Sequence, residues 1–363
     1  MSKVIRFGKK VVKFRIPILV VSVLLLIPSV IGYLQTRINY DILSYLPEDI
    51  ETMQGQEILL DEFGTGAFSV CVVSGMEDKD ISVLEEELKE VDHVKDVLWY
   101  GSAADLSMPV ELLPGDLKDV LRNADTGSSL LILTFDTSMS ADETLLAIEE
   151  IRGLTERNCL LGGMSAVVTD IKKICNSEAV MYVVIAAVLS ALVLGLAMDS
   201  FLIPAVFLLS IGMAIVYNLG TNRIAGEISF ITQALAAVLQ LAVTMDYSIF
   251  LWHSYEENQT RYPGDKKRAM AHAISQTVTS VVGSSITTIA GFLAMCFMTF
   301  TLGMDLGIVM AKGVVFGVIG CVTILPSMVL VFDKWLEKTK HKPLLPDLGK
   351  IGGFVTKHYP VFI

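Results

Sequence analysis

Residues 179–219 read AVMYVVIAAVLSALVLGLAMDSFLIPAVFLLSIGMAIVYNL, a run whose single charged residue is Asp199. A helix that crosses a bilayer needs about 20 mainly apolar residues. The run is long enough for two crossings, and Asp199 and Ser200 stand between them. It therefore predicts two successive membrane helices, over 179–198 and 201–219, and it makes the chain a helical membrane protein.

Four further apolar stretches meet the same criterion of length. They cover 16–34, 228–252, 278–300 and 303–332. A long polar block, 35–178, separates the first span from the other five, which occupy 179–332. The predicted fold class is an α-helical membrane bundle of six transmembrane helices in a 1+5 layout, with a domain inserted between the first and second helices.

Composition supports this assignment. Apolar residues make up 53% of the chain and charged residues only 18%, against about 25% in an average soluble domain. The mean hydropathy is +0.59. These values exclude a disordered chain, a basic nucleic-acid-binding protein and an ordinary cytosolic enzyme.

Charge is distributed unevenly between the polar block and the remaining chain. The block 35–178 holds 29 acidic and 10 basic residues, although the net charge of the whole chain is only −11. Basic residues gather in 1–15, 261–268 and 333–350. Because lysine and arginine mark cytoplasmic segments, we expect a basic cytoplasmic N-terminus, a cytoplasmic loop at 333–350 and an extracytoplasmic acidic block, all on a multi-pass protein of the cytoplasmic membrane.

The acidic block reads as a mixed α/β domain. Strands are predicted over 68–74, 94–100, 128–136 and 158–168, and helices over 81–91 and 141–156. This order fits a split-βαβ, ferredoxin-like sandwich. The block contains Cys71, Cys159 and Cys175, which leaves a structural disulfide open. It shows no metal-site spacing, nucleophile–base pair or phosphate loop, so we expect neither an enzyme nor a cofactor.

A short repeat links the two ends of the chain. The segment 12–20 aligns with 355–363, and in both a proline precedes an apolar run. Transporters are often built of two repeats. We therefore expect 351–363 to begin a seventh span, truncated here, so that the chain is one half of a longer protein or a natural half-transporter.

Asp246 is the most informative residue in the membrane spans. A charge inside the bilayer is costly and is a functional candidate by default, so we expect this carboxylate to load and release a proton. The alternative is that Asp246 only snorkels to the cytoplasmic interface. Gln240, Thr244 and Tyr247 form a polar stripe on the same helix at an i, i+4, i+7 spacing.

Other polar residues stand in the last two spans. Ser284, Ser285 and Thr288 belong to a small-residue stretch that either faces Asp246 or serves ordinary helix packing. Lys312 is deep in the sixth span, where it either pairs with a carboxylate or snorkels outward. His253, Glu256 and Glu257 follow the fourth span and form either a proton entry or a solvated helix end.

Taken together, these motifs resemble the resistance–nodulation–division (RND) superfamily, and within it the N-terminal half of the MMPL-type exporters. The resemblance rests on the motifs at 39–49, 244–257, 284–295 and 306–326. It implies that Asp246 and Tyr247 form a proton relay and that the block 35–178 is a porter domain. The chain departs from the family pattern at Thr244, where glycine is usual, and at His253–Ser254, where a basic residue is usual.

The resemblance implies export of hydrophobic or amphiphilic molecules, such as lipids or drugs, driven by the proton gradient. The expected partners are that substrate, membrane lipids and a second repeat half from the same chain or another protomer, with no nucleic acid. Patched-like sterol-sensing proteins share the layout. A non-pumping lipid-binding protein or scaffold is therefore the alternative, and sodium coupling is a third possibility.

Overall fold

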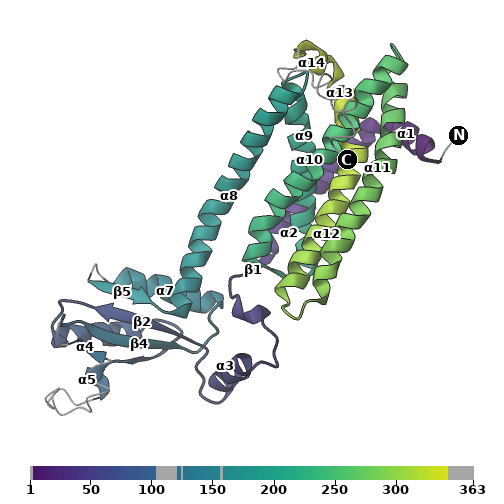
Figure 1. Ribbon diagram of the computed structural model, residues 1–363. Helices are drawn as coiled ribbons and strands as arrows, with labels where there is room; N and C mark the ends of the chain where they lie inside the picture. Colours follow the sequence, from purple (N-terminus) through teal and green to yellow (C-terminus); the bar gives the residue numbers. More distant parts are fainter. Residues whose placement is uncertain (1–2, 104–120, 124–125, 156–157, 342–363) are drawn as a thin grey trace, which may run out of the picture. The chain divides into compact units, whose positions relative to one another are not determined.

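The structure is a computed structural model that describes residues 3–103, 121–123, 126–155 and 158–341 (Figure 1). The chain divides into two compact units. The helical unit comprises Met1–Arg37, Ala179–Phe297 and Met304–Ile363, and the α/β unit comprises Ile38–Glu178 and Met298–Gly303. The predicted start of a seventh span at 351–363 lies outside the described residues.

Within the described part of the chain, six helices are long and apolar enough to cross a membrane, the number that the sequence predicts. They are α2 (Arg15–Gln35), α8 (Met164–Ala197), α9 (Leu202–Gly220), α10 (Phe230–Arg261), α11 (Lys266–Ala294) and α12 (Leu302–Ile319), the last continued by η5 (Gly320–Ile324) and α13 (Leu325–Val331). Shorter elements are α1 (Lys3–Lys13), η3 (Thr221–Ile224), β6 (Glu227–Ser229), η4 (Met295–Phe297) and α14 (Asp333–Lys338).

The core of the helical unit lies between α9, α10 and the α12–α13 helix. Phe207, Leu251 and Leu325 are almost completely buried there. Helix α2 packs closely on α9, because Gly220 meets the backbone of Ser29: a Cβ atom added at Gly220 would lie 2.1 Å from the Ser29 carbonyl oxygen. The Tyr217 hydroxyl also donates to the Ser22 carbonyl at 2.6 Å. This end of the bundle therefore depends on backbone-to-backbone contact.

The last span is not a uniform α-helix. Residues Gly320–Ile324 form a π turn, which ends two residues before Pro326. Proline has no N–H and its ring clashes with the carbonyl four residues earlier, so the α-helical ladder cannot pass through this point unchanged. The wider turn accommodates the proline, and it brings the Cys321 thiol to 3.2 Å from the Tyr247 carbonyl oxygen of α10.

The α/β unit is built on a four-stranded antiparallel sheet of order β3-β4-β2-β5. Its elements in chain order are β1 (Arg37–Asn39, at the junction of the units), η1 (Leu43–Tyr45), α3 (Glu51–Asp61), β2 (Ala67–Val73), α4 (Asp78–Lys89), β3 (Val94–Leu98), α5 (Tyr100–Ala103), β4 (Ser129–Phe135), α7 (Asp142–Leu154) and β5 (Cys159–Gly162). Alternate residues of β2 and β4 are buried together with the inner faces of α4 and α7, as the alternating pattern requires.

The end of this unit differs from the prediction in one respect. The strand expected over 158–168 stops at Gly162, and α8 begins at Met164 rather than at residue 179. The reason is local: Gly163 has a φ of +95°, a conformation that ends the extended strand and that glycine adopts at no steric cost. One continuous helix therefore follows the sheet.

The five cysteines are free thiols, so the disulfide that the sequence left open is not formed. Cys71 is fully buried in the central strand β2. Burial, with a smaller contribution from the neighbouring Cys159, raises the pKa of the Cys71 thiol to about 12. A thiol in this environment stays protonated and is a poor nucleophile.

Candidate functional site

The polar side chains of the membrane spans are organised around α10. Its first turn is held by Asp305 of α12, whose carboxylate accepts from the Ser229 amide at 2.8 Å and from the Thr232 hydroxyl at 2.6 Å. Ser229 in turn accepts from the amide of Ile231 as the N-cap. Asp305 therefore satisfies donors at a helix N-terminus, where a negative charge is also favoured by the helix dipole.

The predicted polar stripe of α10 faces the interior of the bundle. Gln240, Thr244 and Tyr247 are all buried. Helix α12 makes room for two of them with glycines: a Cβ added at Gly317 would lie 2.0 Å from Thr244 Cγ2, and one added at Gly313 would lie 2.9 Å from Gln240 Oε1. The stripe is thus a helix-packing contact as well as a row of polar groups.

Asp246 lies on a different face of α10 and is exposed. It lines an open groove of about 550 Å³ between α10 and α11, which also contains His253, Glu257, Gln276 and Ser280. Gln276 is fixed by Ser254, whose hydroxyl donates to its side-chain oxygen at 2.7 Å. The structure therefore separates Asp246 from the buried stripe and places it in one groove with titratable residues nearer the end of the helix.

The hydroxyl groups of α11 are mostly satisfied within their own helix. Ser285 is buried and donates to the Val281 carbonyl at 2.7 Å, and Thr288 donates to the Ser284 carbonyl at 3.2 Å. Such back-bonding is common for Ser and Thr in membrane helices. Of the α11 hydroxyls, it is Ser280 that lines the groove with Asp246, a residue that the sequence pattern does not distinguish from its neighbours.

Lys312 belongs to a second polar cluster, and two of its members were missed from the sequence. The Lys312 ammonium donates to the Asn222 side-chain oxygen, and Asn218 donates to Gln240 Oε1 at 2.9 Å. The two asparagines come at the end of α9 and in η3, and their only sequence signal is an amide next to an apolar run. Among the described residues Lys312 pairs with an amide rather than with a carboxylate.

Three buried polar atoms of this cluster have no partner among the described residues: Asn218 Oδ1, Asn222 Nδ2 and Gln240 Nε2. Unsatisfied buried groups cost about 1–3 kcal/mol each, and ordered water usually binds them. The cluster is therefore a polar region inside the bundle, on a different face of α10 from Asp246.

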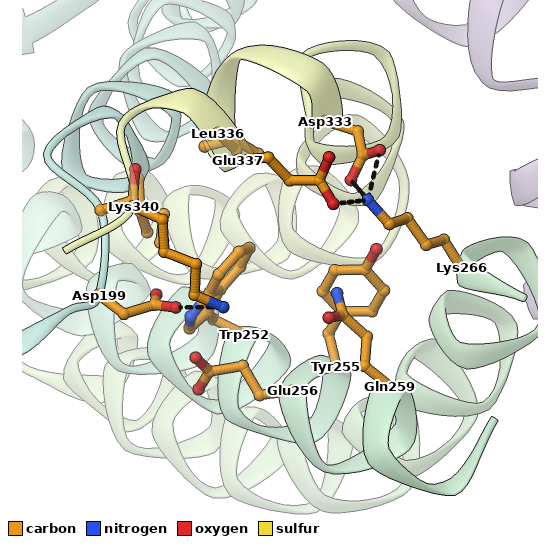
Figure 2. A pocket seen from close by; sticks show the side chains of 12 residues that line it. Asp199, Trp252, Tyr255, Glu256, Gln259, Lys266, Asp333, Leu336, Glu337 and Lys340 are labelled. Carbon is orange, nitrogen blue, oxygen red and sulfur yellow. Dashed lines mark hydrogen bonds and ion pairs between the residues drawn. The ribbon is translucent and has the colours of Figure 1, made fainter. Parts of the chain in front are cut away.

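The end of the bundle that carries Arg261 and Lys266, called the basic end below, has a small pocket of about 90 Å³ (Figure 2). Lys266 of α11 bonds to Asp333 at 2.8 Å and to Glu337, both on α14. Lys340 bonds to Asp199 at 3.0 Å, in the turn between α8 and α9. These ion pairs fasten the segment after the last span to two other parts of the bundle.

The pairing at α14 predicts a dependence of stability on pH. The hydrogen bond and the charge of Lys266 hold the pKa of Glu337 below its usual value of 4.5. A carboxylate with a lowered folded-state pKa stabilises the fold above its unfolded pKa, and the effect is lost as the pH falls through the folded pKa. Since Glu337 is exposed, we expect a small effect.

The measurement is thermal unfolding of the wild type and of Glu337→Gln between pH 7 and pH 3.5. At neutral pH the wild type should have a higher melting temperature than Glu337→Gln. This difference in melting temperature should shrink below about pH 4.5. In a Lys266→Gln background the difference should be absent throughout. A difference that does not change with pH would contradict the assignment.

Among the residues that the structure describes, no group of three or more His, Cys, Asp or Glu side chains is placed to hold a metal ion. The polar groups of the bundle are instead a carboxylate in a groove, a buried row of hydroxyl and amide groups, and a lysine bound to an amide. Groups of these kinds form hydrogen bonds with one another and with water.

The chain is similar in sequence to a family of membrane proteins and to several individual proteins. A family model described as the MMPL family matches residues 59–346. The putative membrane protein MJ1562 of Methanocaldococcus jannaschii is 22% identical over 366 residues, which covers 90% of this chain and 94% of that protein. The putative membrane protein ActII-3 of Streptomyces coelicolor is 32% identical over 136 residues, covering 37% of this chain and 19% of that protein.

Two further matches differ in length from this chain. The probable transport protein MmpL12 of Mycobacterium tuberculosis is 23% identical over 235 residues, covering 61% of this chain and 20% of that protein. The crystal structure of SecDF in its super-membrane-facing form aligns with a TM-score of 0.44 and 14% identity, over 90% of this chain and 39% of that one. The chain thus spans nearly all of the archaeal relative and about a fifth of the Streptomyces and Mycobacterium relatives.

Proposed function

The chain belongs to the MMPL family, and from that premise we propose that it is one half of an RND-type membrane transporter that exports hydrophobic or amphiphilic molecules at the expense of the proton gradient. Its second half would come from the same chain or from another protomer. The basic end would face the cytoplasm and the α/β unit the other side, because basic residues mark cytoplasmic segments.

The observation that carries the proposal is the position of Asp246. It lies in a membrane span but on an exposed face of α10. A charge in the bilayer faces a protein partner or a water-filled cavity, because contact with lipid is too costly. A second half that packs over this face would enclose Asp246 and convert its groove into an internal cavity.

The neighbouring face of α11 is suited to such a contact. A Cβ added at Gly283 or Gly291 would meet nothing within 4 Å, and Ser284 and Thr287 are exposed between them. Small residues let membrane helices approach closely. The face made of Asp246 and these α11 positions is therefore our candidate for the interface between the two halves.

The groove supplies a route for the proton. It extends from Asp246 past His253 to Glu257, toward the basic end of α10. Histidine and carboxylate side chains can bind and pass on protons, and water in the groove would complete the chain between them. Tyr247, next to Asp246 but buried, would join the relay when α10 turns or its neighbours move.

The α/β unit would be the porter domain. Its β-α-β-β-α-β order and the strand order β3-β4-β2-β5 support a ferredoxin-like assignment. It also has an open groove of about 600 Å³ whose lining includes Leu43, Leu59, Phe68 and Met164. An apolar groove suits the hydrocarbon part of an amphiphile.

The coupling ion can be tested in membrane vesicles from cells that express the chain, with a fluorescent phospholipid and Nile red as probes. We expect an imposed pH gradient to drive transport of a probe across the vesicle membrane. A protonophore should abolish this transport. A sodium gradient alone should have no effect. Movement that follows sodium would overturn proton coupling, and binding of the probes without movement under any gradient would favour the non-pumping lipid-binding alternative.

A further inference from the structure

A cleft at the basic end of the helical unit is lined mainly by cationic side chains. It has a volume of about 440 Å³ and lies between α1, the start of α2 and the start of α11. Its lining residues are Lys9, Val12, Lys13, Arg15, Asp265, Lys267, Arg268 and Ala271. Five of the eight carry a positive charge, and one carries a negative charge.

The cleft is held in shape by close packing of α1 on α11. A Cβ added at Gly8 would lie 2.4 Å from the Ala271 carbonyl oxygen, so the two helices touch through their backbones. Val11 and Val12 are buried beside this contact. The basic residues of α1 are thereby fixed opposite those of α11.

Four of the five cationic side chains of the cleft have no acidic partner among the described residues. In the described ranges, no carboxylate forms an ion pair with Lys13, Arg15, Lys267 or Arg268. The one acidic lining residue, Asp265, is the N-cap of α11 and accepts from the Arg268 amide at 3.0 Å. A set of cations in one cleft is repulsive by itself and favours an anionic ligand.

The position of the cleft indicates where that anion comes from. Arg15 and Lys266 begin two of the helices that are long and apolar enough to cross a membrane, so we infer that the cleft lies near the membrane surface. Phe7, Phe14 and Ile16 are exposed on the adjoining turns of α1 and α2. An amphipathic helix with exposed aromatic and basic residues lies in the membrane interface, where lipid head groups are the available anions.

We propose that this cleft binds the phosphate-bearing head group of an anionic membrane lipid, with the exposed apolar residues of α1 and α2 against its acyl chains. Lysine and arginine give charge-assisted hydrogen bonds to phosphate, and basic pockets between membrane helices bind such head groups. The site is separate from the groove of Asp246. Helix α1, which supplies Lys9 and Lys13 to the cleft, lies outside the match to the family model, because that match begins at residue 59.

The test is native mass spectrometry of the full chain in detergent, titrated with phosphatidylglycerol and with phosphatidylcholine. Wild type should prefer phosphatidylglycerol. Removing two charges with K267Q/R268Q should weaken phosphatidylglycerol binding about 30-fold and leave phosphatidylcholine binding unchanged. The matched control is K334Q/K338Q, which removes two exposed lysines near the same end of the bundle but outside the cleft, and should bind like wild type.

A second variant keeps every charge. Gly8→Leu cannot maintain the contact with Ala271, so it should lose the preference for phosphatidylglycerol as K267Q/R268Q does. Equal binding by wild type, K267Q/R268Q and Gly8→Leu would overturn the proposal. Complete displacement of the lipid by millimolar inorganic phosphate would overturn the lipid assignment and identify a site for a soluble phosphate compound instead.

Discussion

Asp246→Asn is expected to reduce gradient-driven transport to the level of vesicles that lack the protein. The amide has nearly the shape of the carboxylate but cannot bind and release a proton at neutral pH. Asp246 is also exposed on α10 in this structure, so the substitution disturbs no buried packing. Probe movement under a pH gradient should therefore be lost while membrane insertion and the melting temperature stay unchanged.

The conservative variant separates chemistry from packing. Asp246→Glu keeps an ionisable group in the same groove and should retain part of the transport activity. Gln240→Leu, which changes the buried stripe, should instead lower stability, because Asn218 then loses its partner. Undiminished transport by Asp246→Asn would remove the proton relay from the proposed function, whereas the lipid site at the basic end would be unaffected.

Gly220→Ala is expected to destabilise the helical unit by about 1–3 kcal/mol, the usual cost of overpacking. Its new methyl group would overlap the backbone of Ser29, which cannot move aside as a side chain can. Helices α2 and α9 would have to separate, and the hydrogen bond from Tyr217 to Ser22 would be strained. Thermal unfolding in detergent measures the effect.

The same helix provides the control. A Cβ added at Gly212 of α9 would meet no atom within 4 Å. Gly212→Ala should therefore leave stability unchanged or raise it by up to about 1 kcal/mol, since alanine is the better helix former. If both variants melt alike, the close approach of α2 and α9 does not contribute to stability.

The sequence was sufficient to predict the elements that have an uninterrupted hydropathy pattern, namely the apolar spans and the alternating strands. Six apolar stretches gave six spans, and alternating burial in β2 and β4 matches the strands expected over 68–74 and 128–136. The start of α8 could not be found in this way. Residues 164–178 mix apolar and charged side chains, and a positive φ at Gly163 is a backbone property that hydropathy does not report.

The candidate site was predicted less completely, for a related reason. Asp246 and the stripe of Gln240, Thr244 and Tyr247 were evident, but a largely apolar helix gives no reliable periodicity from which to assign faces. Asp246 was expected on the same helix as the stripe but not within it, and the groove that it shares with His253 and Glu257 was not predicted. Asn222, the partner of Lys312, is 90 residues away in sequence, and only tertiary packing brings the two together.

The π turn at Gly320–Ile324 has a mechanical meaning for the bundle. A π turn holds one residue more than an α turn, so its conversion to an α-helix would change the phase of the following segment by about 100°. Such a conversion would rotate one part of the last span against the other without breaking the helix. Cys321 in this turn contacts the backbone carbonyl of Tyr247, the residue that follows Asp246. The point at which the register of the sixth span could change therefore lies beside the proposed proton site.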